Sequence, residues 1–205
     1  MELSAFYIDA CKDRIYCDAE NDPARRSAQA TMHEILDTLV RLSAPVLAFT
    51  AEETWEHMTG KTKGSVHLQT FREATPPAGW TAEEGSKWEK LLAIRGKVNE
   101  ALEKERQAKR IGKSLEAEVQ IRGLEAEVQI RGGGMAPEDL GLLREICLVS
   151  HGELQAGPAE ASVQVAPARG KKCVRCWKHE ETVGRDATHT ELCGRCLEVV
   201  KGKRA

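Results

Sequence analysis

Four cysteines in two pairs carry the clearest chemical pattern in this chain. Cys173-x-x-Cys176 is followed, after sixteen intervening residues, by Cys193-x-x-Cys196. Two such pairs supply four thiolates in the arrangement that a tetrahedral structural zinc ion requires. We expect Gly194 to let the backbone of the second pair fold close to the metal, because it has no side chain. The pattern predicts one structural Zn2+ with all four positions filled by sulfur and none left open for catalysis.

The three other cysteines, Cys11, Cys17 and Cys147, show no ligand spacing, and we expect them to be small buried residues. The first residues lack the basic and apolar segments of a signal peptide, and no apolar run is long enough to cross a membrane. The sequence therefore predicts a cytoplasmic protein with reduced thiols and no membrane partner, which disfavours disulfides between the paired cysteines.

The basic charge is concentrated at the end that carries the cysteine pairs. Although the formal net charge of the 205 residues is -2, residues 169–205 hold ten Lys and Arg against five Asp and Glu, and residues 1–168 carry -7. Trp177 directly follows the first pair and lies between Arg175 and Lys178. This combination is typical of base stacking beside phosphate contacts. A solvated basic surface, with Trp177 packed on the metal-binding turn, is the alternative.

Helices must position the first part of the chain. Asp22-Pro23 is a suitable N-cap and first helical residue, Pro45 must break the helix, and Thr50-x-x-Glu53 forms a capping box that restarts it until Gly60. Apolar residues in this stretch have the spacing of a wide buried face: Ile35, Leu36, Leu39, Val40, Leu42, Val46, Leu47 and Phe49.

A second helix follows the turn-rich linker at residues 75–80, with Thr81-x-x-Glu84 as its capping box. Its apolar stripe predicts a buried face, and the charged run from Lys104 to Arg110 predicts a solvated end. The stripe comprises Trp88, Leu91, Leu92, Ile94, Val98, Ala101 and Leu102.

The period then changes to two, because Leu115, Ala117, Val119 and Ile121 alternate with polar residues as in a half-buried strand. The nonapeptide at residues 115–123 repeats at 124–132, and an odd repeat length would turn the second apolar set to the opposite face of one continuous strand. Two arrangements avoid this: a hairpin turning at Arg122-Gly123, or one copy in the sheet with the other looped out.

The remainder of this module is expected to be short elements. Residues 137–146 are interpreted as a helix, and residues 147–149 and 163–165 as two further strands. Together they predict a small α/β module over residues 111–168.

Three runs in the first part of the chain carry a resemblance: Leu3-Ser4-Ala5-Phe6-Tyr7-Ile8-Asp9, Arg25-Arg26-Ser27-Ala28-Gln29 and Leu42-Ser43-Ala44-Pro45-Val46-Leu47. They are similar to the helical anticodon-binding domain of the class I isoleucyl-tRNA synthetases of bacteria. Ile111-Gly112-Lys113-Ser114-Leu115-Glu116 and the two cysteine pairs are similar to the C-terminal extension of the same enzymes, which ends in a zinc module. The resemblance covers essentially the whole chain, although the family usually has one copy of the repeated strand and often a more aromatic sequence after Trp177.

The resemblance implies an α+β fold, mainly α, with a helical anticodon-binding bundle (1–75), a connecting long helix (81–110), the α/β module (111–168) and a zinc-knuckle tail (169–205). The family's His-x-Gly-His and Lys-Met-Ser-Lys-Ser motifs are absent from the sequence. We therefore expect no amino-acid activation by this chain alone, with ATP bound only by a catalytic domain elsewhere.

Recognition of the anticodon stem-loop of isoleucine tRNA is the implied role, with the catalytic domain of the same enzyme as the second partner. The implied zinc ligands are Cys173, Cys176, Cys193 and Cys196. The candidate RNA contacts are Arg25, Arg26, Arg175, Trp177, Lys178 and Arg195.

Two other functions compete with this interpretation. A freestanding zinc module that acts as a tRNA adaptor would have the same tail. Formamidopyrimidine-DNA glycosylases also end in a similar four-cysteine finger, but they need a Pro-Glu start, and here Met1 is followed by Glu2 without a proline. DNA is therefore an unlikely partner on sequence grounds.

Overall fold

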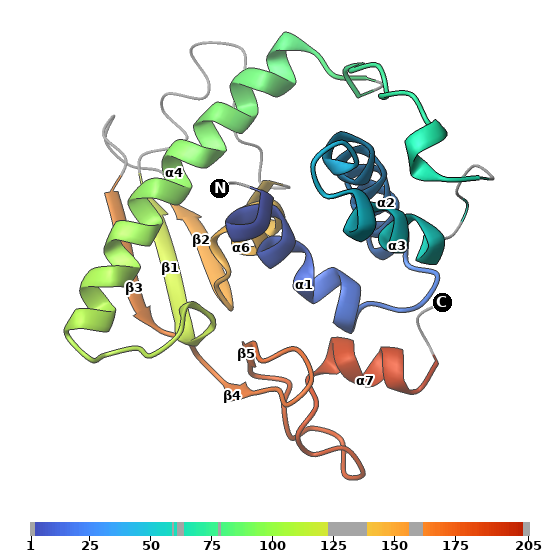
Figure 1. Ribbon diagram of the computed structural model, residues 1–205. Helices are drawn as coiled ribbons and strands as arrows, with labels where there is room; N and C mark the ends of the chain where they lie inside the picture. Colours follow the sequence, from blue (N-terminus) through green and yellow to red (C-terminus); the bar gives the residue numbers. More distant parts are fainter. Residues whose placement is uncertain are drawn as a thin grey trace. The chain divides into compact units, whose positions relative to one another are not determined.

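A computed structural model describes residues 3–58, 60, 64–77, 79–122, 139–155 and 162–202. The chain forms two compact units, one of residues Glu20–Ala78 and one that joins Met1–Ala19 to Gly79–Ala205 (Figure 1). The four-part division expected from the sequence was drawn from motifs and not from compactness, so it stays a prediction beside these two units. The mainly helical α+β class is confirmed. Among the described residues, no helix is long and apolar enough to cross a membrane.

The unit of residues 20–78 consists of α2 (Pro23–Ser43), α3 (Ala48–His57) and the short 3-10 helix η2 (Val66–Leu68). Asp22 caps α2 as expected, since its carboxylate accepts a hydrogen bond of 2.8 Å from the backbone nitrogen of Ala24. α2 ends at Ser43, two residues before Pro45, which confirms the predicted break.

The predicted capping box at Thr50 is wrong. α3 begins two residues earlier, at Ala48, and the backbone nitrogen of Ala51 already donates to the carbonyl of Leu47 at 2.8 Å. Thr50 therefore lies inside the first turn, where its carbonyl accepts a bond from the Thr54 hydroxyl. The helical hydrogen bonding therefore starts at the Leu47 carbonyl, directly after the turn at Pro45, and Thr50 does not act as an N-cap.

Trp55 is the centre of this unit's core and is fully buried. Its indole nitrogen donates to the Gly64 carbonyl at 2.8 Å, and the Arg41 guanidinium lies 4.9 Å from its ring centroid. The other buried apolar members are Val40, Ala44, Ala51, Met58 and Val66.

The wide buried face predicted for these helices is wrong. Of its eight residues, Val40 is buried and Ile35 is half-buried, whereas Phe49 is 93% exposed. α3 and η2 are short, so they cover only one narrow stripe of α2. The exposed members are Leu36, Leu39, Leu42, Val46, Leu47 and Phe49.

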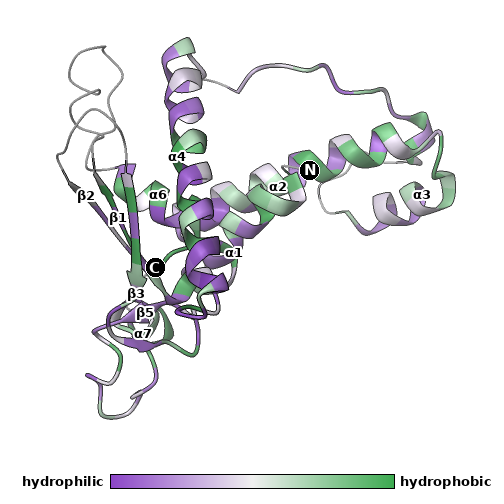
Figure 2. Ribbon diagram, turned by 90° about the vertical axis from the view of Figure 1, so that its left-hand side faces the viewer, coloured by the Kyte–Doolittle hydropathy of each residue, from purple (hydrophilic) through white to green (hydrophobic). Residues whose placement is uncertain are grey.

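The larger unit is organised around α4 (Ala82–Gln107), whose N-cap is Thr81 as predicted. The Thr81 hydroxyl accepts a hydrogen bond of 3.2 Å from the backbone nitrogen of Glu84. Hydrophobic colour recurs in separate bands along α4 in Figure 2, as a single apolar stripe requires. Four members of the predicted stripe are buried, Leu91, Ile94, Val98 and Leu102, whereas the prediction is wrong for Leu92, which is 45% exposed.

A three-stranded sheet packs against this helix, in the order β2-β1-β3. β1 (Ala117–Arg122) follows the 3-10 helix η3 (Ser114–Glu116), pairs in parallel with β2 (His151–Gln155) and pairs antiparallel with β3 (Ser162–Pro167). The apolar side predicted for β1 is confirmed, because Ala117, Val119 and Ile121 are all buried. The polar side departs from the prediction, because Glu118 is also buried and its carboxylate is bonded to Arg169.

Both edges of β1 are thus occupied by β2 and β3. The hairpin arrangement, which needed one edge of this strand for the second nonapeptide, is wrong. The second copy itself, residues 124–132, lies outside the described residues.

α6 (Asp139–Cys147) confirms the helix expected over residues 137–146, and β3 contains the strand expected at 163–165. The strand predicted at 147–149 is wrong. Leu148 has φ 56°, and the nitrogens of Leu148 and Val149 bond to the carbonyls of Glu145 and Arg144. These two bonds close the helix in a Schellman motif, so the chain becomes extended only at His151.

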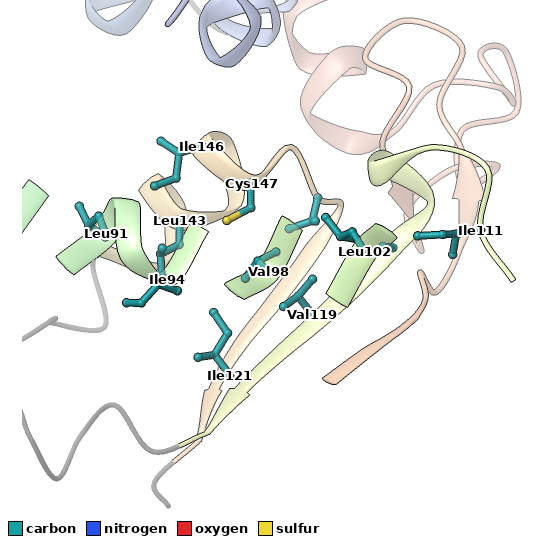
Figure 3. Close-up of a cluster of buried hydrophobic side chains, with 12 residues drawn as sticks. Leu91, Ile94, Val98, Leu102, Ile111, Val119, Ile121, Leu143, Ile146 and Cys147 are labelled. Atoms are coloured by element: carbon teal, nitrogen blue, oxygen red, sulfur yellow. The ribbon is translucent and has the colours of Figure 1, made fainter. Parts of the chain in front are cut away.

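One apolar core joins α4, α6 and one face of the sheet, and Figure 3 shows its side chains pointing into the same space. Burying this surface is the main source of stability for these elements, which we call the sheet module. The buried members are Leu91, Ile94, Val98, Leu102, Ile111, Ala117, Val119, Ile121, Leu143, Ile146, Cys147 and Val149.

Two further parts complete the larger unit. The π-helix η1 (Leu3–Tyr7) runs into α1 (Ile8–Cys17), and residues 169–202 form the finger, with β4 (Lys171–Lys172), β5 (His179–Glu180) and α7 (Gly194–Val200). Gly170 is required where the finger begins. Its φ is 87°, and a Cβ there would lie 2.4 Å from the backbone carbon of Glu180.

Candidate metal centre and nucleic-acid interface

The two cysteine pairs meet in the finger. Cys173 and Cys176 lie on a turn closed by the nitrogen of Trp177 bonding to the carbonyl of Cys173 at 2.9 Å. Cys193 is the N-cap of α7, and Cys196 lies in its first turn. All four side chains are buried, and their sulfur atoms lie within 4.8 Å of one another.

This geometry fits a single tetrahedral metal ion. Zinc–sulfur bonds of about 2.3 Å place neighbouring sulfurs about 3.8 Å apart in a tetrahedron. The Cys176 and Cys193 sulfurs are 3.8 Å apart. The backbone nitrogen of Cys193 donates to the Cys173 sulfur at 3.4 Å and so links the two cysteine pairs. The donor set of four cysteine sulfurs therefore fits a zinc-type site.

The expectation that Gly194 is needed because a side chain would not fit there is wrong. A Cβ at Gly194 would meet Thr182 at 3.7 Å, an ordinary contact. The backbone nitrogen of Gly194 instead donates to the Thr182 hydroxyl at 3.0 Å, which holds the start of α7 against the turn at Thr182.

Cys17 is a fifth thiol beside the four. It belongs to the same buried cluster, and its sulfur lies 3.5 Å from the Arg175 carbonyl oxygen. A hydrogen bond to Cys196 and burial raise the pKa of Cys17. Cys147 lies in the sheet module, where burial raises its pKa to about 12, and Cys11 is also buried. All three are packed residues, as the sequence predicted.

Three of the basic residues expected to contact RNA are bonded to α1. Arg175 donates to the carbonyls of Tyr16 and Cys17 at the end of that helix. Lys178 forms an ion pair of 2.7 Å with Asp13. Arg195 bonds both oxygens of Asp13 and also reaches Asp18 at 3.1 Å. These contacts attach the finger to the N-terminal helix.

Asp13 is the common acceptor of this attachment, with only 19% of its side chain exposed. Burial alone would raise the pKa of Asp13. Hydrogen bonds and positive charge from Arg195 and Lys178 outweigh that effect and lower the pKa below its ordinary value. Asp13 is therefore ionised at neutral pH and bound to two cations.

Trp177 behaves differently from these three residues. It is 56% exposed, and its φ of 64° lies in the left-handed region. An L-residue with a bulky side chain pays about 1–2 kcal/mol for that conformation, which glycine would adopt without cost. A strained and exposed aromatic residue of this kind is characteristic of a functional surface.

Two lysines that sequence reasoning missed flank this ring. The ammonium groups of Lys113 and Lys172 lie 5.7 and 5.8 Å from the Trp177 ring centroid. Lys113 is held by Glu116, whose carboxylate accepts hydrogen bonds from the nitrogens of Gly112 and Lys113, and these bonds lower the pKa of Glu116. No local spacing could reveal Lys113, because it lies far from Trp177 in the sequence.

The two remaining candidates, Arg25 and Arg26, lie in the first turn of α2, in the other compact unit. Arg26 is exposed and Arg25 is half-buried.

Comparison with known proteins gives two family matches. Residues 1–121 match the family described as the anticodon-binding domain of tRNA ligase. Residues 170–199 match a zinc finger found in FPG and IleRS. The second match covers all four clustered cysteines.

Bacterial isoleucine–tRNA ligases are similar along almost the whole chain. The enzyme of Azotobacter vinelandii is 40% identical over 216 residues, that of Dichelobacter nodosus 43% over 207, and that of Geobacter sulfurreducens 39% over 212. Each alignment covers 98% of this chain but only 21–22% of the relative. The chain thus spans about a fifth of the length of the curated relatives it matches.

Proposed function

Because this chain belongs to the anticodon-binding domain family of tRNA ligases, we propose that it is the tRNA-binding C-terminal portion of an isoleucine–tRNA ligase. Its role is to recognise the anticodon region of isoleucine tRNA during ATP-dependent isoleucylation. The observation that carries the proposal is the order of the two family matches within one chain, residues 1–121 and then 170–199.

One structural zinc ion is part of this proposal, with Cys173, Cys176, Cys193 and Cys196 as ligands. Four thiolates fill the tetrahedron, so no position is open to water or substrate. When bound, the ion would link the turn of Cys173 and Cys176 to the start of α7 through metal–sulfur coordination, and it would take part in no chemical step.

The proposed RNA contacts divide into two groups by their surroundings. Trp177 and Arg26 are exposed and free to meet a base or a phosphate. Arg175, Lys178 and Arg195 donate hydrogen bonds to acceptors on α1 and at its C-terminal end, so their first contribution is to hold the finger in place. We propose that their remaining exposed surface contacts RNA. Arg25 is proposed as a phosphate contact at the start of α2.

The activity of the whole ligase requires a catalytic domain, the second proposed partner. That domain binds ATP and isoleucine, whereas this chain holds the anticodon end. The exposed apolar side of α2 and α3, with Phe49 and Val46 at 93% and 82% exposure, is consistent with an intramolecular contact of that kind. A cytoplasmic location belongs to the same proposal, because reduced thiols are required for zinc.

The competing functions receive less support. A DNA-repair finger of the FPG type would share residues 170–199 but not the anticodon-binding match over residues 1–121. A freestanding tRNA adaptor would retain RNA binding but would require no isoleucine specificity.

Fluorescence anisotropy tests the proposal. The zinc-loaded chain is titrated with isoleucine tRNA, an anticodon-altered version, an unrelated tRNA and duplex DNA at two salt concentrations. We expect the anticodon change to weaken binding and DNA to bind least. Equal affinity for all four polyanions would contradict anticodon recognition.

A further inference from the structure

Cys17 is a buried thiol beside the four clustered cysteines, and the zinc site proposed above makes no use of it. It is only 4% exposed and packs with the four in one core cluster. Cys17 is the last residue of α1, whereas the four proposed ligands belong to the finger. A cysteine sulfur at this place is chemically suited to the same metal, because thiolates are the ligands that such sites use.

The Cys17 sulfur contacts both halves of the site. A hydrogen bond joins it to the sulfur of Cys196 on α7, and it lies 3.5 Å from the carbonyl oxygen of Arg175, in the turn of the first pair. Among the described residues, however, the group of sulfurs that all lie within 4.8 Å of one another does not include Cys17. Because zinc in such sites takes four ligands, Cys17 is placed to exchange with its neighbour Cys196 and not to add a fifth bond.

The backbone around Cys17 is bonded to the finger at two points. Arg175 donates to the carbonyls of Tyr16 and Cys17, and Arg195 binds the carboxylate of Asp13. Each of these arginines directly precedes a ligand cysteine in the sequence, so both bonds hold the end of α1 against the metal position. With its backbone held there, Cys17 can move its sulfur by rotation about one side-chain bond.

A cavity beside Cys17 gives that rotation room. It measures about 860 Å³, and Cys17 and Cys176 both contribute to its wall. All its lining residues belong to the larger compact unit. In a close-packed core a change of rotamer meets neighbouring atoms, and an adjacent cavity removes part of that restriction.

We propose that Cys17 is a reserve zinc ligand that takes the place of Cys196. In the exchange the Cys17 sulfur gives up its proton and bonds to the metal, while the Cys196 sulfur leaves the metal and takes up a proton. Four thiolates are bound before and after, so the charge of the site is unchanged. The inference rests on the zinc site proposed above and adds that α1, within the match over residues 1–121, can hold the same ion as the finger.

Metal content and cobalt absorption test the proposal on the full chain. The chain is loaded with Zn2+ or with Co2+, whose absorption differs between four bound thiolates and three, and a phosphine reductant ensures that no added thiol binds the metal. Cys196→Ser should keep one metal ion per chain and the four-sulfur spectrum, because Cys17 supplies the fourth thiolate. The double variant with Cys17→Ser and Cys196→Ser should lose both.

Cys193→Ser is the matched control. It makes the same substitution at the other ligand of the second pair, whose sulfur has Cys176 and Cys196 as hydrogen-bond partners. Stoichiometric metal should therefore be lost in Cys193→Ser although Cys17 is present. A Cys196→Ser chain that loses metal to the same extent, or that binds it with a three-sulfur spectrum, would overturn the proposal.

A second measurement leaves all four ligands in place. Zinc release to an excess of chelator should be faster from Cys17→Ser than from the unaltered chain, because a Cys196 sulfur that leaves the metal is then not replaced. Equal release rates would count against the reserve ligand. If the unaltered chain itself lacks the four-sulfur cobalt spectrum, the zinc site fails and the reserve ligand with it, whereas failure of Cys196→Ser alone leaves the zinc site standing.

Discussion

The sheet module and the finger lie in the same compact unit but are stabilised by different means. The sheet module buries twelve residues in one core, with large aliphatic side chains on α4, β1 and α6. The core of the finger consists of four cysteines of its own, Cys17 from α1 and a single valine, Val183. A segment of about 30 residues cannot bury enough apolar surface to fold alone, so a metal ion has to replace the missing core.

The finger is also attached from outside. Arg175, Lys178 and Arg195 bind α1, while Ser150 of the sheet module accepts a hydrogen bond of 2.8 Å from the backbone nitrogen of His179. The exposed indole of Trp177 is therefore positioned by the polar contacts and the cysteine cluster of the finger, whereas Lys113 beside it is held by the hydrogen bonds that Glu116 accepts.

Loss of metal should have the largest effect, because it should destabilise the finger and leave the sheet module folded. Removing one ligand with Cys193→Ser, or all metal with a chelator, is expected to abolish zinc binding and cost the finger about 10 kcal/mol or more. Hydrogen exchange should then accelerate in the finger but not in β1. Zinc content by atomic spectroscopy provides the control, and a protected finger without metal would contradict the metal-based core.

A cavity in the apolar core should destabilise the sheet module and leave the zinc content of the finger unchanged. Leu102→Ala is expected to lower the free energy of unfolding of the sheet module by about 2–5 kcal/mol, because Leu102 is fully buried. The matched control is Leu92→Ala on the same helix, where the side chain is 45% exposed and the expected change is within about 0.5 kcal/mol. Urea denaturation measures the free energy of unfolding of both variants. A lower zinc content in Leu102→Ala than in Leu92→Ala would contradict the idea that the finger and the sheet module are stabilised independently.

The attachment to α1 should be weaker than either core. Asp13→Asn leaves Lys178 without its carboxylate and leaves Arg195 with Asp18 alone, and it is expected to cost about 1.5–3 kcal/mol in finger docking. Hydrogen exchange of the finger at pH 7 measures the loss. Asp9→Asn is the control, because among the residues that the structure describes Asp9 forms its one ion pair with the exposed Lys12 on the same helix.

The pH dependence of stability also tests the role of the Asp13 carboxylate. The folded pKa of Asp13 is lowered, so its stabilising contribution is complete above the unfolded pKa of about 3.9 and is lost as the pH falls through the folded value. The difference between the unaltered chain and Asp13→Asn should therefore shrink in acid, and a difference that grew would refute the assigned role.

The smallest effect is expected at the fifth thiol. Cys17→Ser should keep one zinc ion per chain and change stability by no more than about 1 kcal/mol, because Cys17 packs beside a ligand set that is already complete. Metal titration and thermal denaturation measure the two quantities. Loss of stoichiometric zinc would mean that Cys17 is itself a ligand.

Features predicted correctly from the sequence depend on neighbours within a few residues. The caps at Asp22 and Thr81 follow from a side chain reaching two or three residues ahead. The apolar side of β1 and the buried members of the α4 stripe follow from the periods of strand and helix. Where such a local rule failed, as at Thr50 and Leu148, another local bond formed first.

The candidate site divides in the same way. Sequence spacing was enough to single out the four cysteines that cluster in the finger, because each pair is held by one turn, and to mark Trp177 as a base-stacking candidate. It could not show that Lys178 and Arg195 bind an aspartate of α1, 165 and 182 residues earlier in the chain, or that Lys113 lies beside Trp177, because these contacts arise from tertiary packing. It also left most of the apolar face of α2 and α3 exposed and placed β1 between two partners. Local spacing specifies turns, caps and periods, but contacts between distant segments depend on how whole elements pack, which no short pattern encodes.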